Sequence, residues 1–190
     1  MREGFQIERK RAALLVIDMM KYFCDESSSA CVGEPNMLIT GVVRLVDVFV
    51  KARRPVVYTR HLDVSTRRNM MMKWWQENIL PSNPLSELID ELDTSKGMVL
   101  IKHQYDAFSK TRLERVLLQK RVEQVVICGV LTNLCCETTA RSAFMRGFEV
   151  YFTEDTTRTY TRAMHDATLL NLGYGFATIV KTAEVLKAME

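Results

Sequence analysis

Three residues with reactive side chains, Asp18, Lys102 and Cys135, each come at or shortly after the end of a short apolar segment. A thiol can attack a carbonyl carbon, a carboxylate can move the proton, and an ammonium group can stabilise the anions. If the apolar segments are parallel strands of one sheet, their carboxyl ends lie at one edge, where ligands bind. The pattern predicts a candidate catalytic site, although Asp18 and Lys102 without the cysteine would also fit a structural ion pair.

Cys135 lies where a strand is expected to lead into a helix. The first turn of a helix presents free N–H groups and the positive end of the helix dipole, which favour a thiolate and can bind an oxyanion. The alternative is that Cys135 is a small buried hydrophobe. Its neighbour Cys136 points about 100° away on a helix, so only one of the two can face the site. Cys128, Cys24 and Cys31 are expected to be structural.

The elements that position these residues alternate along the chain. Apolar runs typical of doubly covered strands occur at residues 12–17, 55–59, 98–101, 124–130, 149–153 and 177–180. Helical patterns occur between them, at residues 37–51, 111–119, 138–146 and 163–172. This alternation predicts one domain over residues 1–190, with a parallel sheet and helices on both faces.

Residues 65–84 have no clear pattern and contain Trp74 and Trp75 among methionines and basic residues. Two interpretations stay open for this segment. It either packs on its own domain or a neighbouring subunit, or it forms a lid over the site.

The composition limits the possible functions. A chain of 190 residues with 47% hydrophobic content suits a globular protein, and its net charge of +3 is scattered, which disfavours nucleic-acid binding. An odd number of cysteines without CxxC spacing disfavours a disulfide framework or a zinc site and favours the cytoplasm. The first apolar stretch is too short for a signal peptide or a membrane span, so we expect no membrane association.

Three sequence blocks resemble the isochorismatase-like cysteine hydrolases, a family that includes nicotinamidases and N-carbamoylsarcosine amidohydrolases. The first block covers residues 14–19 and contains Asp18. The second block consists of Lys102, Tyr105, Ala107, Phe108, Thr111 and Leu113. The third block consists of Gly129, Val130, Thr132, Asn133, Cys135, Thr139 and Ala140.

The resemblance implies a three-layer α/β/α, Rossmann-like fold with a six-stranded parallel sheet, assembled into homodimers or homotetramers. It implies a catalytic triad of Asp18, Lys102 and Cys135. It also implies a cis peptide bond between Val130 and Leu131, which would aim the Leu131 N–H, with that of Cys135, at a developing oxyanion.

A mechanism without a cofactor follows from the resemblance. Asp18 takes the thiol proton, Lys102 stabilises both anions, and Cys135 attacks the carbonyl carbon of a small amide or ureido substrate. Asp18 then gives the proton to the departing ammonia and activates the water that hydrolyses the covalent intermediate.

The substrate is predicted less directly. The preferred class is an N-carbamoyl amino acid such as N-carbamoylsarcosine, whose carboxylate could pair with Arg158 or Arg60. Nicotinamidases carry a metal cluster of one aspartate and two histidines after the second strand. Here His61 and Asp63 have no second histidine nearby in the sequence, so we expect no metal and give His61 a substrate-binding or positioning role.

Three alternatives stay open. The chain could be a nicotinamidase. It could be an isochorismatase-type vinyl-ether hydrolase, although members with that activity lack the cysteine. It could also be a non-catalytic binding protein on the same fold.

Overall fold

Six short strands that are rich in buried aliphatic residues form one parallel sheet in the computed structural model, which describes residues 6–66 and 69–190. The strand order is β3-β2-β1-β4-β5-β6, and each neighbouring pair is parallel. The strands are β1 (Ala12–Ile17), β2 (Val56–His61), β3 (Met98–Lys102), β4 (Gln124–Val130), β5 (Glu149–Arg158) and β6 (Thr178–Val180). This arrangement confirms the predicted α/β fold.

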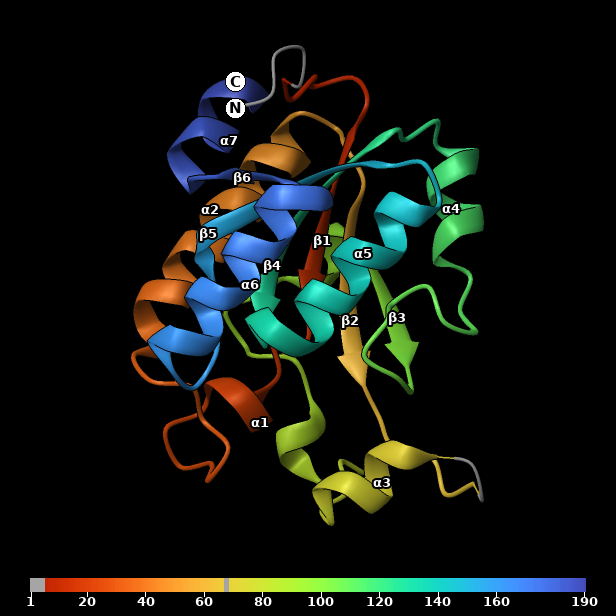
Figure 1. The fold of residues 1–190 in the computed structure, drawn as a ribbon, viewed down its shortest axis with the longest axis vertical. Helices are drawn as coiled ribbons and strands as arrows, with labels where there is room; N and C mark the ends of the chain where they lie inside the picture. The colour runs from red at the N-terminus through yellow and green to blue at the C-terminus, as the bar shows by residue number, and fades with distance from the viewer. Residues whose placement is uncertain (1–5, 67–68) are drawn as a thin grey trace.

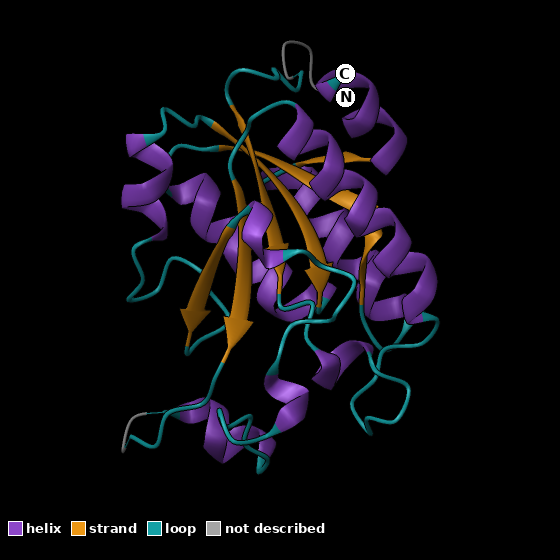
Figure 2. Cartoon of the chain, turned by 180° about the vertical axis from the view of Figure 1, so that it is seen from behind, coloured by secondary structure: helices purple, strands orange, loops and turns teal. Residues whose placement is uncertain are grey.

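Helices cover both faces of the sheet (Figures 1 and 2). One layer contains α2 (Pro35–Lys51) and α7 (Thr182–Met189), and the other contains α4 (Leu113–Gln119), α5 (Glu137–Met145) and α6 (Arg162–Gly175). Alternate residues of β1 enter the two cores, because successive side chains of a strand point to opposite faces. Among the described residues, no helix is long and apolar enough to cross a membrane.

The carboxyl ends of the strands point toward two short helices, α1 (Lys21–Cys24) and α3 (Met70–Trp75), at the lower end of Figure 1. At this end β4 passes very close to β1. Gly129 has a φ of 113°, and a Cβ atom there would lie 2.1 Å from the carbonyl oxygen of Ile17. Glycine is therefore required at 129 for the two strands to end side by side.

Some elements differ from the sequence-based prediction. The polar residues 154–158 extend β5 beyond the apolar run, because Thr157 and Arg158 pair with Gly129 and Val130 after a shift in register between Ile127 and Gly129. Helices α1, α3 and α7 were not predicted, nor were the short helices η1 (Pro84–Ser86), η2 (Thr94–Lys96) and η3 (Thr132–Cys136). The first two helices are too short to show a helical period in the sequence.

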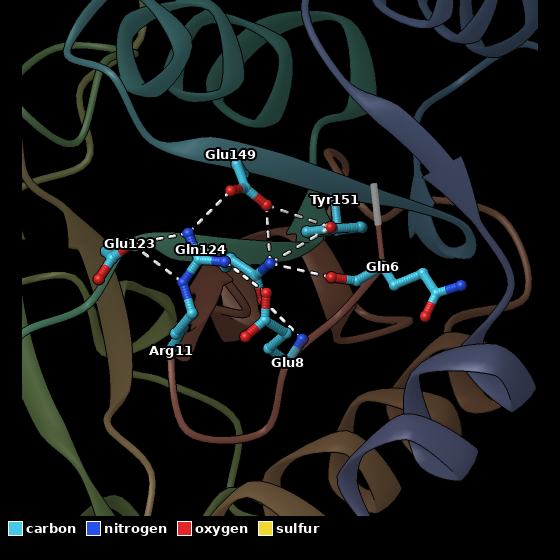
Figure 3. A network of polar contacts seen from close by, with 7 residues as sticks. All are labelled: Gln6, Glu8, Arg11, Glu123, Gln124, Glu149 and Tyr151. Atoms are coloured by element: carbon cyan, nitrogen blue, oxygen red, sulfur yellow. Dashed lines mark hydrogen bonds and ion pairs between the residues drawn. The ribbon is translucent and has the colours of Figure 1, made fainter. Parts of the chain in front are cut away.

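The amino ends of the strands hold a polar network (Figure 3). Its members are Gln6, Glu8, Arg11, Glu123, Gln124, Glu149 and Tyr151. Gln124 is fully buried, and its side chain donates to the Gln6 carbonyl oxygen and to Glu149 and accepts from the Glu8 N–H. Arg11 pairs with Glu8, Glu123 and Glu149. The network ties the segment before β1 to the starts of β4 and β5.

Candidate active site

The three predicted catalytic side chains meet at the carboxyl edge of the sheet. The Lys102 Nζ lies 2.7 Å from Asp18 Oδ2 and 3.4 Å from Cys135 Sγ. Asp18 and Lys102 are completely buried, and Cys135 is 7% exposed. The ammonium group also donates to the Gln104 carbonyl oxygen at 2.9 Å. One cation thus links a carboxylate and a thiol away from bulk water.

Asp18 is held in one orientation by Thr59, a fully buried residue of β2. The Asp18 N–H donates to Thr59 Oγ1 at 3.0 Å, and that hydroxyl donates to Asp18 Oδ1 at 2.7 Å. Oδ1 is thereby occupied, and Oδ2 faces the Lys102 ammonium group with no further hydrogen bond. Sequence reasoning missed Thr59, although a hydroxyl at the end of an apolar run was a visible signal.

Cys135 lies in η3, a π-helical turn between β4 and α5. Two side chains from later in the chain hold this turn. Thr132 Oγ1 lies 3.1 Å from His165 Nδ1, and Thr159 Oγ1 donates to Asn133 Oδ1 at 2.7 Å. The turn directs Cys135 to Lys102.

The other four cysteines lie apart from this contact. Cys136 is fully buried in the core under α5, Cys128 lies in β4, and Cys24 ends α1. All five cysteines, including the half-buried Cys31, are free.

The thiol of Cys135 is protonated in the resting site. Burial raises its pKa to about 12, and the nearby Lys102 charge offsets only part of that effect. The contribution of the helix start to the thiolate stays a prediction; in the structure, desolvation opposes it and disfavours the anion. The ammonium group stays charged: burial lowers the pKa of Lys102, but Asp18 and Cys135 raise it above its ordinary value.

This arrangement suits a thiol that becomes a nucleophile only when a base removes its proton. The thiol needs a base, and the carboxylate of Asp18, which contacts the same ammonium group, can accept its proton. The peptide bond between Val130 and Leu131 is cis, as the resemblance implies. The use of the Leu131 and Cys135 N–H groups as an oxyanion hole stays a prediction.

Neither predicted arginine contacts the three reactive groups. The Arg60 guanidinium group donates to the Ser86 carbonyl oxygen and to Glu87, both at 2.7 Å. Arg60 follows Thr59 directly in β2, so its side chain leaves the opposite face of the sheet. Arg158 donates to the Gly33 carbonyl oxygen at 3.0 Å and pairs with Glu34. These contacts give no support to a carboxylate-binding role, which stays a prediction.

His61 lies beside the triad at the end of β2. Its Nε2 lies 3.3 Å from Asp63 Oδ1, and His103 Nδ1 lies 2.6 Å from the Leu62 carbonyl oxygen. Within residues 6–66 and 69–190, no three acidic, histidine or cysteine side chains are arranged to hold a metal ion. The described residues therefore do not fit the metal cluster of nicotinamidases.

Part of the segment 65–84 is tied to the loop after Lys102. Trp75 Nε1 donates to the Tyr105 hydroxyl at 2.7 Å, and Gln104 donates to Asn69 Oδ1 at 3.4 Å. Trp74 is 73% exposed. Helix α3 thus packs on its own chain at the site end of the sheet; residues 67 and 68 lie outside the described residues. A lid role or a subunit contact stays a prediction.

The chain is similar to known proteins in sequence and in fold. The family model described as "Isochorismatase domain" matches residues 12–184. Nicotinamidase 3 of Arabidopsis thaliana is 40% identical over 95% of this chain and 89% of that protein.

Two solved structures have the same fold. A cysteine hydrolase from Pseudomonas syringae pv. phaseolicola has a TM-score of 0.91 at 24% identity, covering 100% of this chain and 98% of that one. An N-carbamoylsarcosine amidase from Thermoplasma acidophilum has a TM-score of 0.78 at 24% identity, covering 90% and 96%.

Proposed function

The chain belongs to the isochorismatase family and is one of its cysteine hydrolases, and on this premise we propose that it releases ammonia from the –CO–NH₂ group of a small amide or ureido compound. One observation carries the proposal. The Lys102 ammonium group lies within contact distance of both the Asp18 carboxylate and the Cys135 thiol, in a fully buried site. A structural ion pair alone would give the thiol no part in the arrangement.

The first half of the reaction forms a covalent intermediate. Asp18 accepts the proton of the Cys135 thiol, and the sulfur attacks the carbonyl carbon of the substrate. Lys102 stabilises the carboxylate of Asp18 before the proton transfer and the thiolate of Cys135 after it. Asp18 then gives that proton to the amide nitrogen, the C–N bond breaks, and ammonia leaves a thioester on Cys135.

The second half restores the enzyme. Asp18, again ionised, takes a proton from a water molecule, and the hydroxide attacks the thioester carbon. The C–S bond breaks, the proton returns to the sulfur, and the product is a carboxylic acid or, from a ureido group, a carbamic acid that loses carbon dioxide.

Two substrates lead the amide class. Nicotinamide is supported by the 40% identity to a protein named as a nicotinamidase. N-carbamoyl amino acids such as N-carbamoylsarcosine are supported by a fold neighbour named for that activity and by the presence of Arg158 near the carboxyl edge. The contact of Arg158 with Glu34 weakens the second case, because the guanidinium group already has a carboxylate partner.

The test measures ammonia release from nicotinamide, N-carbamoylsarcosine and other N-carbamoyl amino acids. We expect turnover of at least one of them by the unmodified chain and none by Cys135→Ala. The matched control is Cys136→Ala, which removes the neighbouring thiol and leaves the Lys102 contact in place. Retained turnover in Cys135→Ala would contradict the proposed nucleophile.

The cellular setting and assembly belong to the same proposal. Five free cysteines suit a reducing compartment, so we place the enzyme in the cytoplasm. We propose a homodimer or homotetramer, in which the exposed Trp74 and Met70 of α3 lie at a subunit contact. Light scattering after size-exclusion chromatography measures the assembly, and a monomer would contradict it.

A further inference from the structure

The imidazole of His61 has one nitrogen that no protein group satisfies. His61 is only 3% exposed, and its Nδ1 is buried with no hydrogen-bond partner in the protein. Buried polar groups in folded proteins almost always have a partner, so an unpaired one marks a place where a ligand can supply it. The other ring nitrogen, Nε2, lies 3.3 Å from Asp63 Oδ1.

Asp63 determines which nitrogen carries the hydrogen. Its Oδ2 accepts from the Ile79 N–H at 2.9 Å. Burial alone would raise the pKa of Asp63, but hydrogen bonds from His61 and Ile79 bring it below its ordinary value. An ionised carboxylate can only accept, so in the neutral imidazole the hydrogen is on Nε2. Nδ1 is then left with a lone pair and acts as an acceptor.

The geometry of the sheet places this acceptor beside the reactive groups. His61 comes two residues after Thr59 in β2, so both side chains leave the same face. His61 is also the register partner of Lys102 in β3. Thr59 holds Asp18 and Lys102 contacts Cys135, so His61 lies next to the triad on the face where the chemistry takes place.

On the basis of the proposed function, we propose that His61 Nδ1 accepts a hydrogen bond from an N–H of the bound amide or ureido group, and that Asp63 sets the tautomer required for it. His61 is then a specificity-determining residue. It favours substrates that present an N–H at this position and disfavours those that present a lone pair, such as a pyridine-type nitrogen or an ester oxygen.

The decisive variant is Asp63→Asn. The amide N–H of asparagine can donate to Nε2, which moves the ring hydrogen to Nδ1 and converts the acceptor into a donor. We expect KM for the best amide substrate to rise about tenfold or more, as for loss of a buried hydrogen bond, while kcat changes less. Asp93→Asn is the matched control, because it makes the same substitution at a residue that accepts from the Ser95 N–H in the turn before β3, and it should leave KM unchanged.

A spectroscopic measurement tests the tautomer without turnover. In the unmodified chain the ¹⁵N resonance of His61 Nδ1 should be pyridine-like, and in Asp63→Asn it should be pyrrole-like. Titration of Cys135→Ala with nicotinamide and with an N-carbamoyl amino acid should shift the Nδ1 resonance upfield as it accepts the hydrogen bond.

The outcomes separate this inference from the proposed function. A pyrrole-like Nδ1 in the unmodified chain, or an unchanged KM in Asp63→Asn with the fold intact by circular dichroism, would overturn the role of His61 and leave Cys135 as the nucleophile. One equivalent of zinc that is lost in Asp63→Asn would also overturn it, because His61 would then be a ligand. Absence of any amide turnover, with the expected tautomer present, would instead contradict the proposed function.

Discussion

A cation is paired with acidic groups at each end of the sheet, Arg11 at the amino end and Lys102 at the carboxyl end, and the two differ mainly in burial. At the amino end the Arg11 side chain is 30% exposed and pairs with three carboxylates (Figure 3). At the carboxyl end the Lys102 side chain is fully buried and faces one carboxylate and one thiol. Exposed ion pairs are hydrated, and each contributes little to the stability of the protein. When one partner of a buried ion pair is lost, the protein is strongly destabilised. At the amino end the charged groups tie segments of the chain together. At the carboxyl end the charged groups surround the thiol that we propose as the nucleophile.

The two ends also differ in how completely their polar atoms are paired. Among the described residues, three buried side-chain atoms have no hydrogen bond. Two of them lie at the carboxyl end: Asp18 Oδ2, which is in the ion pair with Lys102, and His61 Nδ1. The third belongs to Arg54, whose Nε donates to the Ala12 carbonyl oxygen near the amino end. In the network around Gln124, every side-chain nitrogen and oxygen of that residue has a partner. Of the three atoms without a hydrogen bond, His61 Nδ1 is the one beside the reactive groups that a ligand can complete.

The largest effect is expected when the buried pair is broken. Lys102→Met should lower kcat at least about 10⁴-fold, because Asp18, Lys102 and Cys135 act as one unit. It should also lower the free energy of unfolding by about 3–5 kcal/mol, since it leaves the Asp18 carboxylate buried and unpaired. Activity assays and urea unfolding measure the two effects.

The double variant Asp18→Asn/Lys102→Met tests whether the buried, unpaired charge causes the loss of stability. It should recover most of the lost stability, because no buried charge remains, and stay inactive. A double variant as unstable as Lys102→Met would show that packing, and not charge, explains the loss.

A smaller effect is expected from Thr59→Val, which keeps the shape of the side chain and removes both hydrogen bonds to Asp18. We expect kcat to fall roughly 10- to 100-fold, because Oδ1 is left unpaired and the carboxylate loses its orientation. Thr59→Ser restores the hydroxyl and should recover most of the activity. If Thr59→Val keeps its activity and Thr59→Ser loses it, the methyl group matters and the hydrogen bonds do not.

The protonation state of Cys135 gives a pH-dependent prediction. Its pKa is raised to about 12, so below that pH the thiolate fraction, and the rate of alkylation by iodoacetamide, should rise about tenfold per pH unit. Asp18 contributes to raising this pKa, so Asp18→Asn should be alkylated faster at pH 8 although it is inactive. Mass mapping of Cys135 measures both rates. A rate that is flat from pH 7 to pH 9 would mean a resting thiolate.

The smallest effect on activity is expected at the amino end. Gln124→Leu leaves the Glu8 N–H and the Gln6 carbonyl oxygen without their partner, which should cost about 1–3 kcal/mol of stability. Turnover at a temperature where the variant stays folded should match that of the unmodified chain. Loss of turnover would show that the two ends are coupled, which the comparison does not predict.

The sequence predicted the elements whose side chains are apolar and missed those held by polar contacts. Residues 12–17 and 124–130 are strands with the predicted bounds, because every side chain in them is buried. Residues 154–158 were missed, because they are polar and rejoin the sheet only where Thr157 and Arg158 pair with Gly129 and Val130.

The site, too, has features that the sequence predicted and features that it missed. The order of Asp18, Lys102 and Cys135 along the chain and their places at strand ends were sufficient to predict that they meet. Sequence could not give the sign of the Cys135 pKa shift, because it depends on how completely the neighbouring elements exclude water. It also could not show that Thr59 and His165 support the site, since these contacts join distant parts of the chain.

The central position of β1 has a consequence for synthesis on the ribosome. This strand is made before its neighbours, and its second edge stays uncovered until β4 has emerged. A fully apolar strand with an open edge is prone to pair with other chains, so the nascent protein needs protection during that interval. Asp18, Lys102 and Cys135 all leave the ribosome before Thr159 and His165, which hold the cysteine turn. A chain that stalls between these points contains every reactive group but lacks the contacts that hold the turn of Cys135.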